Sequence, residues 1–154
     1  SSALHPIPPR RYVFLDGPYG VFSQEAMAGD RPIVMLAGGI GITAFLRAIW
    51  RLEENPRRSS YLLYGSPESK KIIYREALEE VRHVKIVHVV EKDGQFPYEK
   101  GLITLDLIRQ HVREDLGECD FLLCGPPAMI DKLERELRSS GVSAQHIHHE
   151  LFGF

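Results

Sequence analysis

A cluster of glycines between an apolar run and a helical pattern is the first feature of this sequence that could do chemistry. Gly38, Gly39 and Gly41 fall within four residues, and Thr43 follows them. Glycines at the end of a strand let the backbone approach a ligand closely, and the amide groups at the start of the next helix favour an anion. The cluster therefore predicts a phosphate-binding turn, with a tight turn that holds no ligand as the alternative. Its spacing is not the GxGxxG of the usual dinucleotide fingerprint.

A second junction of the same kind lies near the end of the chain. It reads CGPPAM from Cys124 to Met129. Gly125 again clears space for a ligand, and Pro126 stiffens the entry to the helix that follows. A small buried cysteine followed by an ordinary helix start explains the same residues equally well. Together with the first junction, however, it marks a second strand end at which a ligand could lie.

Two further strand ends carry polar side chains. Ser66 lies in GSPES, where its hydroxyl can hold a ribose or a phosphate, or can instead cap a helix. Glu91 and Lys92 follow the next apolar run. A carboxylate at such a place can accept both hydroxyls of an adenosine ribose, whereas a solvated charge pair is the alternative. Taken one at a time, these residues leave both interpretations open.

Histidines near the C-terminus raise the question of a metal site. Residues 146–150 read HIHHE. On a strand, His146 and His148 share one face and His149 lies on the other, so only two imidazoles converge. We therefore expect no metal site. The chain also contains neither a GxSxG nucleophile elbow nor a Walker-type GxxxxGK[ST] motif.

Alternating strands and helices must position these junctions. Apolar runs of strand length occur at 33–37, 61–64, 84–90, 121–124 and 145–151, and helical patterns occur at 42–54, 70–82, 104–114 and 126–140. This alternation predicts an α/β fold with a five-stranded, doubly wound parallel sheet, helices on both faces and a loop over 91–101. Ligands bind such sheets at the carboxyl ends of the strands, where the strand order reverses. The two glycine-bearing junctions fall at such strand ends.

Composition narrows the classes of function. The chain has 154 residues, of which 44% are hydrophobic and 26% are charged, as in an ordinary globular domain. The net charge of −2 gives no electrostatic case for binding nucleic acid. The longest uncharged stretch, 33–46, is shorter than the ~20 residues that a membrane span needs. Two cysteines cannot form a disulfide framework, so we expect a reducing, cytoplasmic compartment.

Four motifs in order resemble the pyridine-nucleotide domain of the ferredoxin–NADP reductase superfamily. They are LAGGIGITAF (36–45), YGSPESKKIIYREALEE (64–80), LCGPPAMID (123–131) and HELFGF (149–154). In addition, DGPYGVF (16–22) resembles the last strand and exit turn of the family's flavin-binding barrel. The resemblance implies that residues 1–30 are the tail of such a barrel with a linker, and that 31–154 form the nucleotide domain. The flavin domain would then belong to the same, longer polypeptide.

The resemblance also implies roles for particular residues. The diphosphate of NADH or NADPH would lie near 39–43, and the adenosine end near Ser66 and the residues after the third strand. The nicotinamide would approach Cys124 and Gly125. Glu150 and Phe152 match the family's Glu-x-aromatic pair at the flavin ring.

Phe152 and Phe154 are both candidates for the ring that stacks on the flavin. Two residues of the chain follow Phe152, which is why both aromatic side chains remain candidates.

The implied activity is transfer of a hydride from NAD(P)H to FAD, followed by release of single electrons to ferric iron, a heme or an iron–sulfur protein. DGPYG, EKDGQF and IHHELFGF look most like bacterial ferric reductases and NADPH-oxidase-like flavocytochromes. A parent of that type would add a heme-bearing membrane domain and place this domain at the cytoplasmic face. Soluble hydroxylase and cytochrome reductases are the nearest competitor. A stand-alone nucleotide-binding regulatory module, or a domain that has lost binding, is the alternative from another class.

The choice between NADH and NADPH depends on charge after the third strand. The family's NADPH users place a serine–arginine pair there, whereas Glu91-Lys92 resembles the acid–base pair of NADH-linked cytochrome reductases. A carboxylate accepts a 2′-hydroxyl and repels a 2′-phosphate, which favours NADH. Four cations oppose this preference, because any of them could reach a phosphate: Lys70, Lys71, Arg75 and Lys92.

Overall fold

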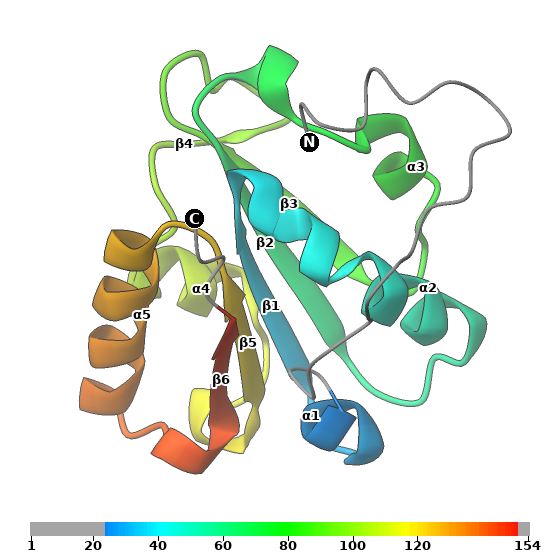
Figure 1. Ribbon diagram of the computed structural model, residues 1–154, viewed down its shortest axis with the longest axis vertical. Helices are drawn as coiled ribbons and strands as arrows, with labels where there is room; N and C mark the ends of the chain where they lie inside the picture. The colour runs from blue at the N-terminus through cyan, green and yellow to red at the C-terminus, as the bar shows by residue number, and fades with distance from the viewer. Residues whose placement is uncertain (1–23, 151–154) are drawn as a thin grey trace, which may run out of the picture.

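One parallel sheet lies between two layers of helices in the computed structural model, which describes residues 24–150, the side chains of the first two excepted (Figure 1). The strands are β1 (Ile33–Gly38), β2 (Ser60–Ser66), β3 (Lys85–Val90), β4 (Glu99–Lys100), β5 (Asp120–Cys124) and β6 (Ile147–Glu150). Their order in the sheet is β4-β3-β2-β1-β5-β6, and every neighbouring pair is parallel. The strand order therefore reverses between β1 and β5.

The helices cover both faces of this sheet (Figure 1). They are α1 (Gln24–Ala28), α2 (Leu46–Glu54), α3 (Arg75–Glu79), α4 (Leu105–His111) and α5 (Pro127–Ser139), with short 3₁₀ turns η1 (Gly39–Ala44), η2 (Ser69–Lys71), η3 (Leu116–Glu118) and η4 (Ala144–His146). One apolar core lies under α2 and α3, and a second lies under α4 and α5. The predicted α/β fold with helices on both faces is confirmed.

The central strands are apolar on both sides because both sides are covered. In β1, Val34 and Leu36 point into the core under α4 and α5, while Met35 and Ala37 point into the core under α2 and α3. All four side chains are fully buried. A strand buried on both faces reads as a continuous apolar run rather than an alternating one, and that run predicted β1 from the sequence.

The sheet has six strands rather than the five predicted. The additional strand, β4, lies inside the predicted loop 91–101 and pairs with the last two residues of β3. Two residues are too few to show the alternation that identifies a strand. The predicted helix over 70–82 is also divided, into η2 and α3. Between them Tyr74 adopts a left-handed backbone conformation with φ of 57°, which cannot continue a right-handed helix.

Some predictions fall on residues outside the described range. They include most of the proposed barrel remnant, residues 1–23, and the terminal aromatic residues Phe152 and Phe154. Within 24–150, no helix combines the length and the apolar character that crossing a bilayer requires.

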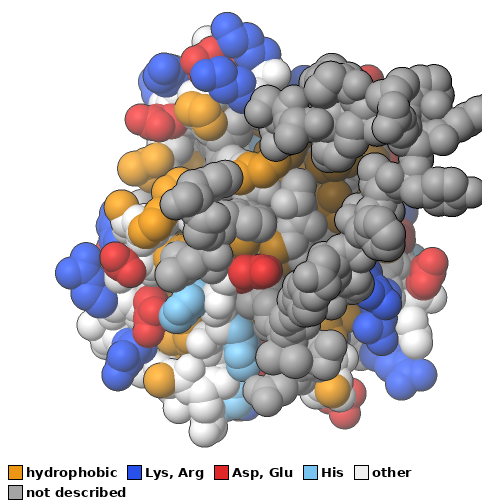
Figure 2. Space-filling view, in the orientation of Figure 1, with side chains coloured by type: hydrophobic (Ala, Val, Ile, Leu, Met, Phe, Trp, Pro, Cys, Tyr) orange, Lys and Arg blue, Asp and Glu red, His pale blue; other side chains and the backbone are white. Residues whose placement is uncertain are grey.

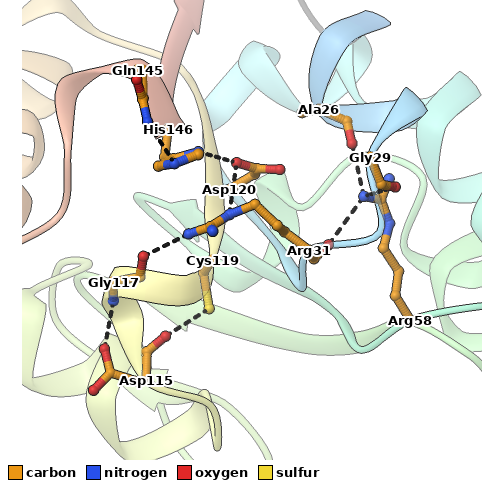
Figure 3. A network of polar contacts seen from close by, with 10 residues as sticks. All are labelled: Ala26, Gly29, Arg31, Arg58, Asp115, Gly117, Cys119, Asp120, Gln145 and His146. Atoms are coloured by element: carbon orange, nitrogen blue, oxygen red, sulfur yellow. Dashed lines mark hydrogen bonds and ion pairs between the residues drawn. The ribbon is translucent and has the colours of Figure 1, made fainter.

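A polar network closes the amino-terminal edge of the sheet (Figure 3). Asp120, the first residue of β5, is buried, and its Oδ1 lies 2.8 Å from Nδ1 of His146 and 3.5 Å from Nε of Arg31. Arg31 also donates to the carbonyl of Gly117. The network ties β5 to η4 and to the segment that enters β1. It lies at the opposite end of the strands from the glycine-bearing junctions.

Asp120→Ala should therefore lower the free energy of unfolding by about 1–3 kcal/mol, because it leaves the guanidinium of Arg31 and the ring of His146 without their carboxylate. Urea denaturation measures the change. Asp106→Ala is the matched control, because Asp106 is almost fully exposed and its ion pair with Arg109 is long, at 3.9 Å. Equal stability of the two variants would show that the network contributes nothing.

Candidate functional site

A pocket of about 550 Å³ opens at the carboxyl ends of the central strands. It lies where the strand order reverses, the position at which doubly wound sheets bind ligands. Among the lining residues that fall within 24–150, the one carboxylate is Glu91 and the one cation is Lys132, and most of the others are apolar or glycine. The lining residues are Gly38, Gly39, Gly65, Ser66, Pro67, Glu91, Gly101, Leu102, Ile103, Pro126, Ala128, Met129, Lys132 and Leu133.

The base of the pocket is a close contact between the two glycine-bearing junctions. A Cβ atom on Gly38 would lie 2.7 Å from Cδ of Pro126 and 2.9 Å from Sδ of Met129. A Cβ atom on Gly125 would lie 2.7 Å from Cε of Met129 and 3.0 Å from the Gly38 backbone. The end of β1 and the start of α5 thus pack backbone against side chain. Glycine is required at both positions for that packing, whatever ligand is bound.

The structural reason for glycine differs between positions 39 and 41. A Cβ atom on Gly41 would overlap the carbonyl of Cys124, so this glycine permits internal packing. Gly39 has φ of +54° and nothing within 4 Å of the place of its Cβ atom, and it lines the pocket. The packing against Cys124 is thus a structural reason for glycine at position 41, and the binding of a ligand by Gly39 and Gly41 stays a prediction.

Thr43 does not line the pocket. Its Oγ1 donates to the carbonyl oxygen of Ile40 at 2.9 Å, within the η1 turn. The hydroxyl thus stabilises the turn that carries Gly39. Its effect on a ligand would pass through the shape of that turn.

Cys124 and Glu150 are neighbours across the pair β5–β6, where they are in register. The Cys124 side chain is fully buried, and burial first, then the Glu150 carboxylate, raises the pKa of its thiol to about 11. The thiol is therefore protonated and enclosed at neutral pH. It can shape the end of β5, but it cannot act as a thiolate nucleophile.

The polar side of the pocket is built by a continuation of the β2–β3 pairing. The amide of Glu91 donates to the carbonyl of Ser66 at 3.1 Å, and that of Lys92 donates to the carbonyl of Pro67 at 3.1 Å. The Ser66 hydroxyl donates to the carbonyl of Glu68 at 3.0 Å. These bonds place Glu91 on the lining, whereas the Lys92 ammonium lies 3.5 Å from the Glu68 carboxylate.

The predicted site residues thus divide into three groups. The predicted residues that line the pocket are Gly38, Gly39, Ser66, Glu91, Pro126 and Met129. Those that are described but do not line it are Gly41, Thr43, Lys92, Cys124, Gly125 and Glu150. The remaining two, Phe152 and Phe154, lie outside the described range. In residues 24–150, no three His, Cys, Asp or Glu side chains gather as a metal site would require.

Sequence reasoning missed several lining residues. Leu102 and Ile103 are brought to the pocket by β4, which the sequence pattern did not reveal. Lys132 follows Ala128 by four residues in α5, so the two share one face of the helix. Extending the second junction by one helical turn would have found the lysine.

A known protein family matches most of this chain. The family model described as the oxidoreductase NAD-binding domain matches residues 35–135. This chain belongs to that family. NADH-cytochrome b5 reductase 2 of Gallus gallus is 36% identical over 104 residues, which are 62% of this chain and 34% of that protein. The chain therefore spans about a third of the length of that relative.

Solved structures agree with this family. The cytochrome b5 reductase domain of Ulva prolifera nitrate reductase is 26% identical with a TM-score of 0.67, covering 79% of this chain and 48% of that one. A ferredoxin NADP⁺ reductase of Neisseria gonorrhoeae, solved with FAD and NADP, shares the fold at 19% identity with a TM-score of 0.75, over 86% and 61% of the two chains. The resemblance to the ferredoxin–NADP reductase superfamily is confirmed, whereas the finer likeness to ferric reductases is not shown.

Cys124 should resist an aromatic disulfide reagent at pH 8 in the folded domain and react once urea unfolds it. Cys119→Ala makes Cys124 the single thiol for this measurement. Burial of the neutral thiol raises its folded pKa from 9.0 to about 11. Its contribution to stability is therefore complete below pH 9 and is lost as the pH rises from 9 toward 11. Rapid labelling of the folded Cys119→Ala chain would contradict this assignment.

Proposed function

We propose that this chain is the NAD(P)H-binding half of a flavin-dependent oxidoreductase and that the dinucleotide binds in the pocket at the carboxyl ends of β1, β2 and β3. The observation that carries the proposal is the meeting of two glycine-bearing junctions at the point where strand order reverses. Membership of the oxidoreductase NAD-binding family supports the same conclusion.

The distribution of side chains around the pocket suggests how the nucleotide lies. The diphosphate would lie near Gly39, where the backbone is open and the first amides of η1 have no partner within the turn. Lys132, on α5, would supply positive charge from the lining of the pocket. Ser66 and Glu91 would take the adenosine ribose, with the apolar side chain of Leu102 beside them. The nicotinamide end would approach Gly125 and the carboxyl end of β5.

The residues of this domain bind and orient; the redox chemistry belongs to the cofactors. NAD(P)H supplies a hydride, which FAD in a flavin domain of the parent protein accepts before electrons pass singly to a heme, cytochrome or iron–sulfur acceptor. We place the boundary between the flavin domain and this one near residue 30. Glu150 and the aromatic residues that follow it, Phe152 or Phe154, would lie toward the flavin.

The free cysteines support a proposal for the compartment. Cys119 and Cys124 are both buried free thiols. Free thiols suit a reducing compartment such as the cytoplasm, and we propose that location. If the parent protein is anchored to a membrane, this domain would lie at the cytoplasmic face.

Ala128→Glu tests the nucleotide site. Ala128 is exposed in the first turn of α5 and lines the pocket. An acidic side chain there suits the positive end of the helix, so the fold is retained, but its bulk and charge oppose a diphosphate. NADH affinity, measured by calorimetry, should fall about tenfold or more.

The matched control is Ala144→Glu, an exposed alanine in η4 that lies outside the pocket. It should bind NADH as the unmodified chain does. If Ala128→Glu binds NADH equally well, the dinucleotide does not occupy this pocket.

NADH is the nucleotide that we propose. The Glu91 carboxylate is on the pocket lining, where it can accept a ribose 2′-hydroxyl and repel a 2′-phosphate. The Lys92 ammonium, in contrast, lies against Glu68. The nearest charge on the lining at the adenosine side is therefore negative.

Glu91→Ser should accordingly raise the ratio of NADPH affinity to NADH affinity by about 5–30-fold, because it removes the repulsion of the 2′-phosphate. Parallel titrations with the two nucleotides give the ratio. Lys100→Ser serves as a control for a charge change on the neighbouring strand β4. An unchanged ratio in Glu91→Ser would show that the carboxylate is solvated in the complex.

A further inference from the structure

Three lysines converge on one carboxylate beside the polar side of the pocket. The Glu68 carboxylate lies 3.0 Å from the ammonium of Lys70, 3.3 Å from that of Lys71 and 3.5 Å from that of Lys92. The lysines come from two loops, since two belong to η2 and the third follows β3. Figure 2 shows basic side chains gathered with acidic ones at the top of the view, where η2 and the loop after β3 lie.

The cluster is fixed in place by the backbone around it. The carboxylate of Asp93 accepts from the amide of Ser69 at 2.8 Å and from its hydroxyl at 2.7 Å, which joins η2 to the loop after β3. The carbonyl of Glu68 accepts from Ser66, a lining residue. Lys92 directly follows the lining residue Glu91, and Lys70 and Lys71 follow the lining residue Pro67 by three and four residues.

The charge at the centre of the cluster is permanent. Hydrogen bonds from Lys70 and then Lys71 lower the pKa of Glu68 to about 2, so the carboxylate is ionised throughout the physiological range. Three ammonium groups around one anion make an arrangement that a phosphate could also occupy, because lysine binds phosphate as a compact point charge. In this chain a side-chain carboxylate already fills that place.

We propose that Glu68 occupies a three-lysine anion site beside the adenosine end of the pocket and thereby excludes nucleotides that carry a 2′-phosphate. The inference rests on the proposed binding of the dinucleotide in this pocket. Glu68 differs in its action from Glu91. Glu91 would face the ribose directly, whereas Glu68 engages the three ammonium groups and so occupies the place that the phosphate would take between them. Glu68 is thus a specificity-determining residue that need not touch the nucleotide.

The test uses two adenosine fragments that differ by the 2′-phosphate alone, adenosine 5′-monophosphate and adenosine 2′,5′-bisphosphate. Glu68→Gln keeps the shape of the side chain and removes its charge. It should raise affinity for the bisphosphate about tenfold or more, while affinity for the monophosphate changes less than about twofold. Glu118→Gln is the control, because Glu118 is an exposed glutamate in η3, at the opposite end of the strands from the pocket. It should change neither affinity.

A second pair of variants separates the lysines from a general effect of charge. Lys71→Gln combined with Lys92→Gln should leave the ratio of the two affinities nearly unchanged in the unmodified chain, since Glu68 already engages both ammonium groups. In the Glu68→Gln background the same pair should remove most of the gain, because Lys70 alone then remains of the three lysines. Far-ultraviolet circular dichroism confirms that each variant is folded.

The outcomes distinguish the inference from the function on which it rests. If the monophosphate binds and Glu68→Gln leaves the affinity ratio unchanged, the role of Glu68 is wrong and the nucleotide site stands. If the gain persists without Lys71 and Lys92, the lysine site is wrong. If the unmodified chain binds neither fragment nor NADH, the proposed nucleotide site fails and the inference fails with it.

Discussion

The contact between the carboxyl ends of β1 and β5 is the constraint on which the rest of the site depends. At this point Gly41 packs against the carbonyl of Cys124, and Gly38 packs against Met129 and Pro126. A side chain at Gly41 would overlap the backbone of Cys124, and one at Gly38 would press against Pro126, so either substitution would force this junction to shift. The pocket exists because helices leave this point on opposite faces of the sheet. The same packing that fixes the fold therefore fixes the base of the site.

The positive and the negative side chain of the pocket lining come from different elements. Lys132 lies on the α5 wall and Glu91 follows β3, so a negative diphosphate and a hydroxyl-bearing ribose meet different surroundings within one apolar hollow. The Glu68 cluster adds a second source of nucleotide specificity, outside the lining of the pocket. A charge that does not line the pocket can govern what the pocket accepts by occupying the partners of a competing ligand. NADH lacks the 2′-phosphate on which this specificity depends. The cluster therefore needs no additional contact with NADH.

The sequence predicted the parts of this arrangement that repeat or that carry unusual residues. Continuous apolar runs identified β1 and β5, and glycines marked the strand ends that meet. Three kinds of feature were not predicted. A strand as short as β4 has no periodicity. Tyr74 ends a helical pattern because its backbone is left-handed, a conformation that a tyrosine in the sequence does not predict. The convergence of three lysines on Glu68 also depends on how two loops lie together, and spacing along the chain does not report that.

Gly41 has a structural role that its place in a glycine-rich turn does not reveal. A glycine-rich turn after a buried strand predicts a ligand, and a pocket does open beside it, but this glycine serves the contact with Cys124. Gly39, in contrast, is open where a side chain would be. Substitution at Gly41 would therefore lower stability and binding together, and the loss of binding alone would not identify a ligand contact. Residues such as Ala128 and Glu68, whose side chains can change while the strand ends remain packed, are the positions at which binding and folding can be measured separately.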